Sequence, residues 1–232
     1  MMLEIHIEKG IARLTLDHEA HGNSFGATEA VALSKVLKDK AVSALVLSGR
    51  GTRFFCTGGN LSEQATGTRA ATLATQKKVR AALVALGTWP KPTLALVGGD
   101  AFGGGTELLS SFDFVLSAPH VLIGFWQRKL GLTFGWGGGA RLSSKLGRHL
   151  KPHALKAGVF TAYQARDIGL VDEIYPAYDL EARGLELLRT ILALPAYGEF
   201  KKLDAKNESK TFDKLWMNPT HKKIVDFHSK KK

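Results

Sequence analysis

Alternation of apolar and polar residues marks the start of the chain. Residues 3–8 and 11–16 both alternate, and Lys9-Gly10 separates them. Side chains alternate between the two faces of a strand, and a two-residue break containing glycine favours a tight turn, so the pattern predicts a β-hairpin. Helical spacing of apolar residues over 28–40 and a short apolar run at 44–48 then predict a helix and a buried strand.

The same two patterns continue along the rest of the chain. Residues 69–86 have the spacing of a long amphipathic helix that ends at Gly87 and Pro90. Further strand-like runs cover 93–97, 113–117, 121–123 and 171–175, and further helical runs cover 180–194, 198–207 and 212–229, the last with a break near Pro219. No low-complexity linker divides these runs, so we expect one α/β domain that ends in a helical extension.

Three glycines, Gly103–Gly105, stand where the apolar run 93–97 gives way to helical spacing at Leu108. Glycine allows a sharp turn there, and the first amides of a helix have no partner within the helix. A carbonyl oxygen placed against them could gain negative charge, as in an oxyanion hole. Glu107 lies three residues after Gly104, on the same side of the first turn. Glu107 is therefore a candidate for acid/base catalysis, with helix capping as the alternative.

The amino-acid composition argues against several classes of protein, namely membrane-spanning, disulfide-rich and zinc-binding ones. Hydrophobic residues make up 44% of the 232 residues, no run approaches the length of a membrane span, and no signal peptide is evident, which favours a cytoplasmic protein. The single cysteine, Cys56, excludes an intrachain disulfide framework, is expected to be a small buried residue, and belongs to no zinc-type spacing. The net charge of +11 suits nucleic acid, a membrane surface or a polyanionic small molecule. The lysines after residue 200 have the alternative interpretation of a solvated helix face.

Four ordered segments give the chain a resemblance to the crotonase superfamily, the enoyl-CoA hydratase/isomerase family. They are Phe55-Cys56-Thr57-Gly58-Gly59-Asn60-Leu61, Ala101-Phe102-Gly103-Gly104-Gly105-Thr106-Glu107-Leu108, the run from Leu130 to Leu142, and the run from Phe160 to Glu173. The resemblance implies a spiral of ββα units over residues 1–175 and a helical trimerisation region over 176–232. It also implies an acyl-CoA thioester as substrate, no metal and no separate cofactor, and a homotrimer or hexamer.

The resemblance also assigns roles to residues. The thioester oxygen would accept hydrogen bonds from the amides of Gly59 and Gly104, and Glu107 matches one of the two glutamates of the hydratases. The place of the second glutamate holds Gln127, whose amide cannot exchange a proton at neutral pH. The loops around residues 20–22 and 57–61 are similar to those that hold the CoA nucleotide, and two aromatic residues would line the acyl pocket or the core. The remaining expected substrate-binding residues are therefore Ala20, Gly22, Thr57, Asn60, Leu61, Trp126 and Phe134.

These assignments lead to one main hypothesis and two alternatives. The main hypothesis is an acyl-CoA lyase of the enoyl-CoA hydratase/isomerase type in fatty acid metabolism, which stabilises a thioester enolate. Because Gln127 replaces a proton-transfer residue, a decarboxylase of malonyl-type CoA esters such as methylmalonyl-CoA or ethylmalonyl-CoA is the first alternative. A noncatalytic relative that binds CoA or RNA is the second. The absence of an RNA-binding motif argues against nucleic acid as the partner.

Overall fold

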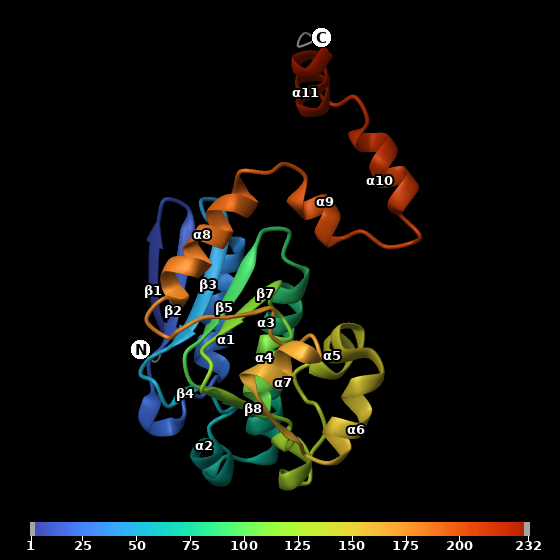
Figure 1. Ribbon diagram of the computed structural model, residues 1–232. Helices are drawn as coiled ribbons and strands as arrows, with labels where there is room; N and C mark the ends of the chain where they lie inside the picture. Colours follow the sequence, from blue (N-terminus) through green and yellow to red (C-terminus); the bar gives the residue numbers. More distant parts are fainter. Residues whose placement is uncertain (1–2, 230–232) are drawn as a thin grey trace.

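Two sheets form the body of the computed structural model, which describes residues 3–229 (Figure 1). The strands of the larger sheet are β1 (Leu3–Glu8), β2 (Ile11–Leu16), β3 (Ala44–Gly49), β5 (Thr93–Val97), β7 (Phe114–Ser117) and β10 (Glu173–Ile174). The strands of the smaller sheet are β4 (Phe54–Cys56), β6 (Asp100–Phe102), β8 (Leu122–Gly124) and β9 (Val159–Thr161). The order is β1-β2-β3-β5-β7-β10 in the larger sheet and β4-β6-β8-β9 in the smaller.

The N-terminal hairpin is confirmed, and it is the antiparallel edge of an otherwise parallel sheet. Leu3 pairs with Leu16 and Glu8 pairs with Ile11. Lys9 and Gly10 both have positive φ, at 50° and 79°, which is the backbone that a tight hairpin turn requires. Parallel pairs then join β2 to β3, β3 to β5, β5 to β7 and β7 to β10. This mixed α/β architecture confirms the predicted fold class.

Helices connect many of the strands and pack on both sheets. Those of the body are α1 (Ala27–Lys38), α2 (Leu61–Thr66), α3 (Arg69–Thr88), α4 (Gly104–Leu109), α5 (Gly138–Leu146), α6 (Leu150–Leu155) and α7 (Ala162–Asp167). Short 3-10 helices cover Glu19–His21, Trp126–Leu130 and Gly147–His149. The remaining helices are α8 (Leu180–Leu192), α9 (Tyr197–Lys201), α10 (Glu208–Leu215) and α11 (Pro219–Ser229). No helix within residues 3–229 is long and apolar enough to cross a membrane.

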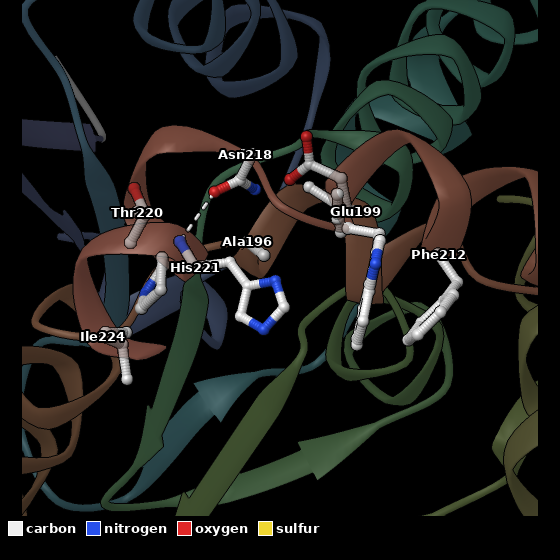
Figure 2. A pocket seen from close by; sticks show the side chains of 10 residues that line it. Ala196, Glu199, Phe212, Asn218, Thr220, His221 and Ile224 are labelled. Carbon is white, nitrogen blue, oxygen red and sulfur yellow. Dashed lines mark hydrogen bonds between the residues drawn. The ribbon is translucent and has the colours of Figure 1, made fainter. Parts of the chain in front are cut away.

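The last four helices fall into two groups. Helix α8 lies across the larger sheet, where Gly184 lies so close to Leu94 and Leu96 that a Cβ atom on it would be 2.7 Å from Leu94 Cδ2. Helices α10 and α11 extend away from the sheets (Figure 1). A cavity of about 390 Å³ lies among α9, α10 and α11, with Phe212 and Ile224 in its lining (Figure 2).

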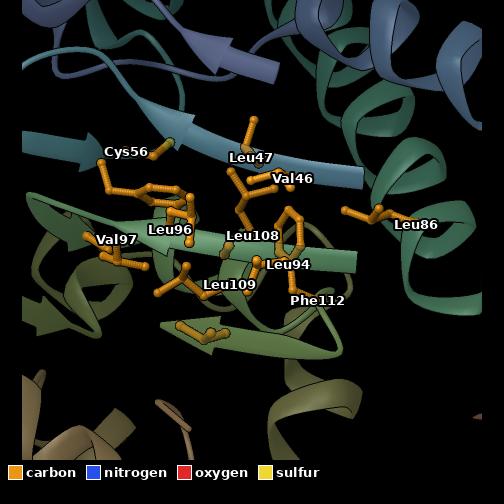
Figure 3. Packing of buried hydrophobic residues seen from close by; sticks show 14 of the residues in the cluster. Val46, Leu47, Cys56, Leu86, Leu94, Leu96, Val97, Leu108, Leu109 and Phe112 are labelled. Atoms are coloured by element: carbon orange, nitrogen blue, oxygen red, sulfur yellow. The ribbon is translucent and has the colours of Figure 1, made fainter. Parts of the chain in front are cut away.

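The core is packed between the larger sheet and the helices. Leu94 and Leu96 of β5 lie close to Leu108 of α4 and to Phe112, in one cluster with Leu47 of β3 (Figure 3). All five side chains are buried. Because α4 follows directly on Gly103 and buries Leu108 and Leu109, this packing fixes the position of the glycine-rich turn.

Several short elements differ from the sequence prediction. Strands β6 and β9 and helix α2 were not predicted, because three to six residues are too few to establish a period. The predicted strand 171–175 is reduced to the two residues of β10. The predicted break near Pro219 in the helical run 212–229 is confirmed: α10 ends at Leu215 and Pro219 begins α11, since proline is well suited to the first helical position.

Candidate active site

Two loops meet at the carboxyl ends of adjacent strands of the smaller sheet. Strands β4 and β6 are parallel neighbours, so the turn after Cys56 lies beside the turn at Gly103. Gly58, with a φ of 103°, packs so closely that a Cβ atom on it would be 3.0 Å from the amide nitrogen of Gly104. Within residues 3–229, the N–H groups of Gly59 and Gly104 donate to no protein acceptor. Two neighbouring amides are therefore available to one carbonyl oxygen.

The carboxylate of Glu107 is buried and accepts four hydrogen bonds. Its Oε2 accepts the N–H groups of Trp136 at 2.8 Å and Gly138 at 3.0 Å. Its Oε1 accepts the N–H of Gly135 at 3.0 Å and the side-chain amide of Gln127 at 3.3 Å. The side chain is only 2% exposed. Glu107 thus caps the N-terminus of α5. The alternative suggested by the sequence was that it caps α4, the helix to which it belongs.

Gln127 contacts Glu107, as counting along the sequence had indicated. Its Nε2 also donates to the carbonyl oxygen of Gly103 at 2.9 Å, so the amide group bridges the glycine turn and the buried carboxylate. Its Oε1 is buried without a hydrogen-bond partner among the residues that the structure describes. The pair can hold substrate or water, but only one member of it is an acid.

Trp136 forms a wall next to both glycine amides. A Cβ atom on Gly104 would lie 2.7 Å from Cη2 of the indole, and one on Gly59 would lie 3.8 Å from Cζ2. The side chain is 4% exposed, and its Nε1 donates to Oε1 of Gln76 at 2.6 Å. The site residues expected from the sequence include neither Trp136 nor Gln76. One feature of the sequence could have pointed to Trp136: a large indole stands between glycines, and such a side chain has to pack on another segment of the chain.

A cavity of about 130 Å³ adjoins this wall. Gly59, Asn60 and Gln76 line it, together with Glu63 of α2. Asn60 also caps α2, because its Oδ1 accepts the N–H groups of Ser62 and Glu63. The cavity is therefore lined by Gly59 and several polar side chains, and one of these, Gln76, holds the indole of Trp136 by a hydrogen bond.

The loops predicted to hold the CoA nucleotide lie side by side. The N–H and the hydroxyl of Thr57 both donate to the carbonyl oxygen of Gly22, at 2.9 Å and 3.2 Å. Gly22 has a φ of 65°, and a Cβ atom on it would collide with Thr57. Ala20 is exposed in the preceding 3-10 helix, and Leu61 is exposed at the start of α2.

Two other predicted substrate-binding residues lie elsewhere. Trp126 stacks on Phe102 with the ring centroids 3.9 Å apart, and Phe134 meets the ring of Phe125 edge-on at 5.9 Å. Neither lines the 130 Å³ cavity. Cys56 is buried, which raises the pKa of its thiol to about 12, so it is not a nucleophile near neutral pH. Within residues 3–229, no group of three or more His, Cys, Asp or Glu side chains is placed to hold a metal ion.

Comparison with known proteins identifies the family. The family model described as enoyl-CoA hydratase/isomerase matches residues 6–218. The chain is 32% identical to 2,3-dehydroadipyl-CoA hydratase of Escherichia coli, over 73% of this chain and 68% of that protein. It is 29% identical to human mitochondrial methylglutaconyl-CoA hydratase, over 73% of this chain and 52% of that protein, so the match spans about half of the human chain.

A solved structure gives the same result for the fold. The crystal structure of an enoyl-CoA hydratase from Bacillus anthracis superposes with a TM-score of 0.90, covering 100% of this chain and 97% of the other at 22% identity. Together with the family match over residues 6–218, this means that the chain belongs to the enoyl-CoA hydratase/isomerase family.

Proposed function

We propose that this protein is an acyl-CoA lyase that forms a thioester enolate at the amides of Gly59 and Gly104. The observation that carries the proposal is the pair of unpartnered N–H groups on two adjoining loops, one of them at the N-terminus of α4. A thioester oxygen between them would be stabilised most strongly when it becomes an enolate, and one such donor is worth roughly 3 to 4 kcal/mol in the barrier. Membership of the family supports a CoA thioester as the substrate.

The surroundings of Glu107 favour some lyase reactions over others. Hydration requires one group to activate water and another to deliver a proton to carbon. Both oxygens of the Glu107 carboxylate already accept hydrogen bonds from four donors, and Gln127 is an amide that exchanges no proton. In this proposal Glu107 therefore has a positioning role, holding the loop 135–138 and the indole of Trp136 against the oxyanion site.

Decarboxylation of a malonyl-type ester, such as methylmalonyl-CoA or ethylmalonyl-CoA, is the lyase reaction that this arrangement supports best. The bond between the α-carbon and the carboxylate breaks, carbon dioxide leaves, and the electron pair remains on the enolate. No base is needed for that step, and solvent can supply the proton that follows. The neutral amide of Gln127 beside Glu107 is the observation that favours it over hydration.

The proposal is tested by turnover of three thioesters, namely crotonyl-CoA, a 3-enoyl-CoA and methylmalonyl-CoA, with the products identified by mass spectrometry. We expect methylmalonyl-CoA to lose carbon dioxide and crotonyl-CoA to be hydrated slowly. The Gln127→Glu variant gains an acid, so its hydration rate should rise at least about tenfold, whereas Glu8→Gln, an exposed change on β1 outside the cavity lining, should not alter it. Fast hydration by the native protein with no gain in Gln127→Glu would contradict the decarboxylase assignment, and failure to bind acetoacetyl-CoA at millimolar concentration would contradict CoA binding itself.

We also propose that the chain assembles as a homotrimer or a hexamer through its C-terminal helices. Phe200, Phe212 and Trp216 expose more than half of their side chains although all three are large and apolar. Exposed apolar patches of this kind mark protein–protein contact sites. Measurement of the mass in solution tests the proposal, and a monomer at micromolar concentration would contradict it.

A further inference from the structure

The six-membered ring of Trp136 faces both glycines of the candidate oxyanion site. A Cβ atom on Gly104 would lie 2.7 Å from Cη2 and 2.8 Å from Cζ3 of this ring, and one on Gly59 would lie 3.8 Å from Cζ2. The ring therefore packs directly on Gly104, where only a residue without a side chain leaves room for it. The proposed lyase chemistry gives this ring no part in choosing the substrate.

The indole separates the 130 Å³ cavity from Gly104. Phe25, Gly59 and Gln76 line the cavity, whereas Gly104 and Glu107 do not. The indole adjoins this lining, because its centroid lies 6.1 Å from that of the Phe25 ring and its Nε1 donates to Oε1 of Gln76 at 2.6 Å. It also packs on Gly104. The indole thus fills the space between the lining of the cavity and the first turn of α4.

Hydrogen bonds to three helices hold the indole in this position. Its Nε1–H is the only donor of the ring, and Gln76 of α3 accepts it. The backbone N–H of Trp136 donates to Oε2 of Glu107 on α4 at 2.8 Å, and its carbonyl oxygen accepts from Nη2 of Arg141 on α5 at 3.1 Å. Because the side chain is only 4% exposed, it has no open solvent into which to turn. The ring therefore keeps one orientation, which Gln76 sets.

A fixed ring at this place limits the length of the acyl group. An acyl chain whose thioester oxygen lies between the amides of Gly59 and Gly104 starts beside the ring. Protein interiors are close-packed, so the volume that the ring fills is closed to a ligand. Each methylene group that a ligand buries in an apolar pocket raises its affinity roughly fourfold, and a chain that finds no room loses that gain.

We propose that Trp136, positioned by Gln76, restricts the substrate to CoA thioesters with a short acyl group. The inference rests on the proposed function, since it places the thioester oxygen at the amides of Gly59 and Gly104. Trp136 is the specificity-determining residue, because its ring faces the acyl group, and Gln76 is a positioning residue that acts through the ring. Malonyl-type esters have the required short acyl group, whereas thioesters of medium-chain and long-chain fatty acids do not.

The experiment compares the binding of two saturated thioesters, butyryl-CoA and octanoyl-CoA, to the full chain by calorimetric titration. Neither has a double bond or a carboxylate on the α-carbon, so neither is hydrated or decarboxylated, and the ratio of their dissociation constants measures chain-length selectivity alone. We expect the native chain to bind octanoyl-CoA no more tightly than butyryl-CoA. Trp136→Leu removes the six-membered ring and keeps an apolar side chain, so it should bind octanoyl-CoA at least about tenfold more tightly than butyryl-CoA.

Variants of Gln76 test the positioning role. Gln76→Leu removes the acceptor of the indole N–H, and we expect it to shift the ratio toward octanoyl-CoA at least about threefold. Gln76→Glu keeps an acceptor oxygen on a side chain of the same length and should retain the native ratio within about twofold. The control is Lys77→Leu, an exposed change on α3 outside the cavity lining, which should leave the ratio unchanged.

Trp89→Leu is the matched control for the loss of a buried indole. Trp89 is 6% exposed and its Nε1 donates to the carbonyl oxygen of Leu37, but it does not line the 130 Å³ cavity. The ratio in Trp89→Leu should therefore stay native. Thermal unfolding verifies that each variant is folded, and the two Gln76 variants decide the question if Trp136→Leu does not fold.

The possible outcomes separate this inference from the lyase proposal. Native binding of octanoyl-CoA about tenfold tighter than that of butyryl-CoA, or an equal shift of the ratio in Trp136→Leu and Trp89→Leu, would overturn the restriction and leave the lyase reaction standing. An unchanged ratio in Gln76→Leu would exclude Gln76 as the positioning residue. Failure of the native chain to bind either thioester would contradict the proposed function itself, and the restriction with it.

Discussion

The loops around Glu107 bury a carboxylate and satisfy it with hydrogen bonds, whereas the helices after residue 194 leave aromatic rings exposed. The charged group of Glu107 is buried, and four donors from distant parts of the chain satisfy it. The apolar rings of Phe212 and Trp216 on and beside α10 are exposed and have mainly one another and His221 as ring neighbours. The carboxylate of Glu107 is thus satisfied within one chain, whereas the rings of Phe212 and Trp216 have apolar surface left to bury.

The difference teaches where each region obtains its stability. A buried carboxylate is tolerated only with full hydrogen bonding, so the Glu107 cluster must be formed whenever the body is folded. A helix with an exposed apolar face gains little until a second surface covers that face. Variants in the body should therefore change the free energy of unfolding, and variants in α10 should change association.

The largest expected effect is on the rate at which the buried thiol of Cys56 reacts with a thiol reagent. Because burial raises the pKa of this thiol to about 12, the thiolate fraction at pH 8 is at least about a thousandfold below that of an ordinary cysteine. Cys56 in the native chain should therefore react with a thiol reagent slower than an exposed cysteine by that factor or more. The control is the double variant Cys56→Ala, Lys206→Cys, which places the thiol in an exposed loop before α10. Similar rates at the two positions would show that the body opens readily.

Removal of the buried carboxylate should have the next largest effect. Glu107→Ala leaves the N–H groups of Gly135, Trp136 and Gly138 without their acceptor, and we expect a loss of about 3 to 5 kcal/mol in the free energy of unfolding. Urea denaturation followed by tryptophan fluorescence measures it, and Glu63→Ala on exposed α2 should change the value by less than about 0.5 kcal/mol.

A purely catalytic role would give the opposite pattern for Glu107. Glu107→Gln would then lower turnover by roughly a hundredfold, the usual scale of acid–base catalysis, with the free energy of unfolding unchanged. Measuring stability and turnover on the same preparations separates that role from the positioning role.

A negative charge introduced among the exposed aromatic residues near α10 should weaken association between chains. Trp216 is 58% exposed, and Trp216→Asp should weaken association by about 2 kcal/mol, roughly thirtyfold, while the body unfolds as before. Light scattering over a range of concentrations measures the shift. Tyr178, an aromatic residue that is 90% exposed before α8, provides the matched control Tyr178→Asp. An unchanged mass for Trp216→Asp would exclude Trp216 from the contact.

The smallest effect is a pH dependence in Gln127→Glu. The new carboxyl would face Oε1 of Glu107 and the carbonyl oxygen of Gly103, so its pKa in the folded state should be raised. A carboxyl with a raised pKa binds more protons when folded, so the variant should lose about 1 to 2 kcal/mol relative to native as pH rises above about 4.3. Urea denaturation at pH 5 and pH 8 measures the difference, and a constant offset between the two proteins would contradict this placement.

The sequence predicted the elements whose signals are local. The hairpin follows from alternation on both sides of Lys9-Gly10, and the turn at Gly103 follows from glycines between an apolar run and helical spacing. The ordered motifs gave the family, which the match over residues 6–218 confirms. The contact of Gln127 with Glu107 could also be predicted, because the family motif fixes the place of Gln127 relative to Leu130-Gly131. Elements of three to six residues, such as β9 and α2, were missed because they are too short to show a period.

Only the tertiary structure decided which groups satisfy Glu107 and what covers the glycine amides. The donors at Gly135, Trp136 and Gly138 lie 28 to 31 residues further along the chain, where no periodic pattern connects them to the carboxylate. The indole of Trp136 reaches Gly104 because α5 packs beside α4. Side-chain periodicity is a property of neighbouring residues, whereas hydrogen bonds between loops depend on how the sheets and helices place those loops in space.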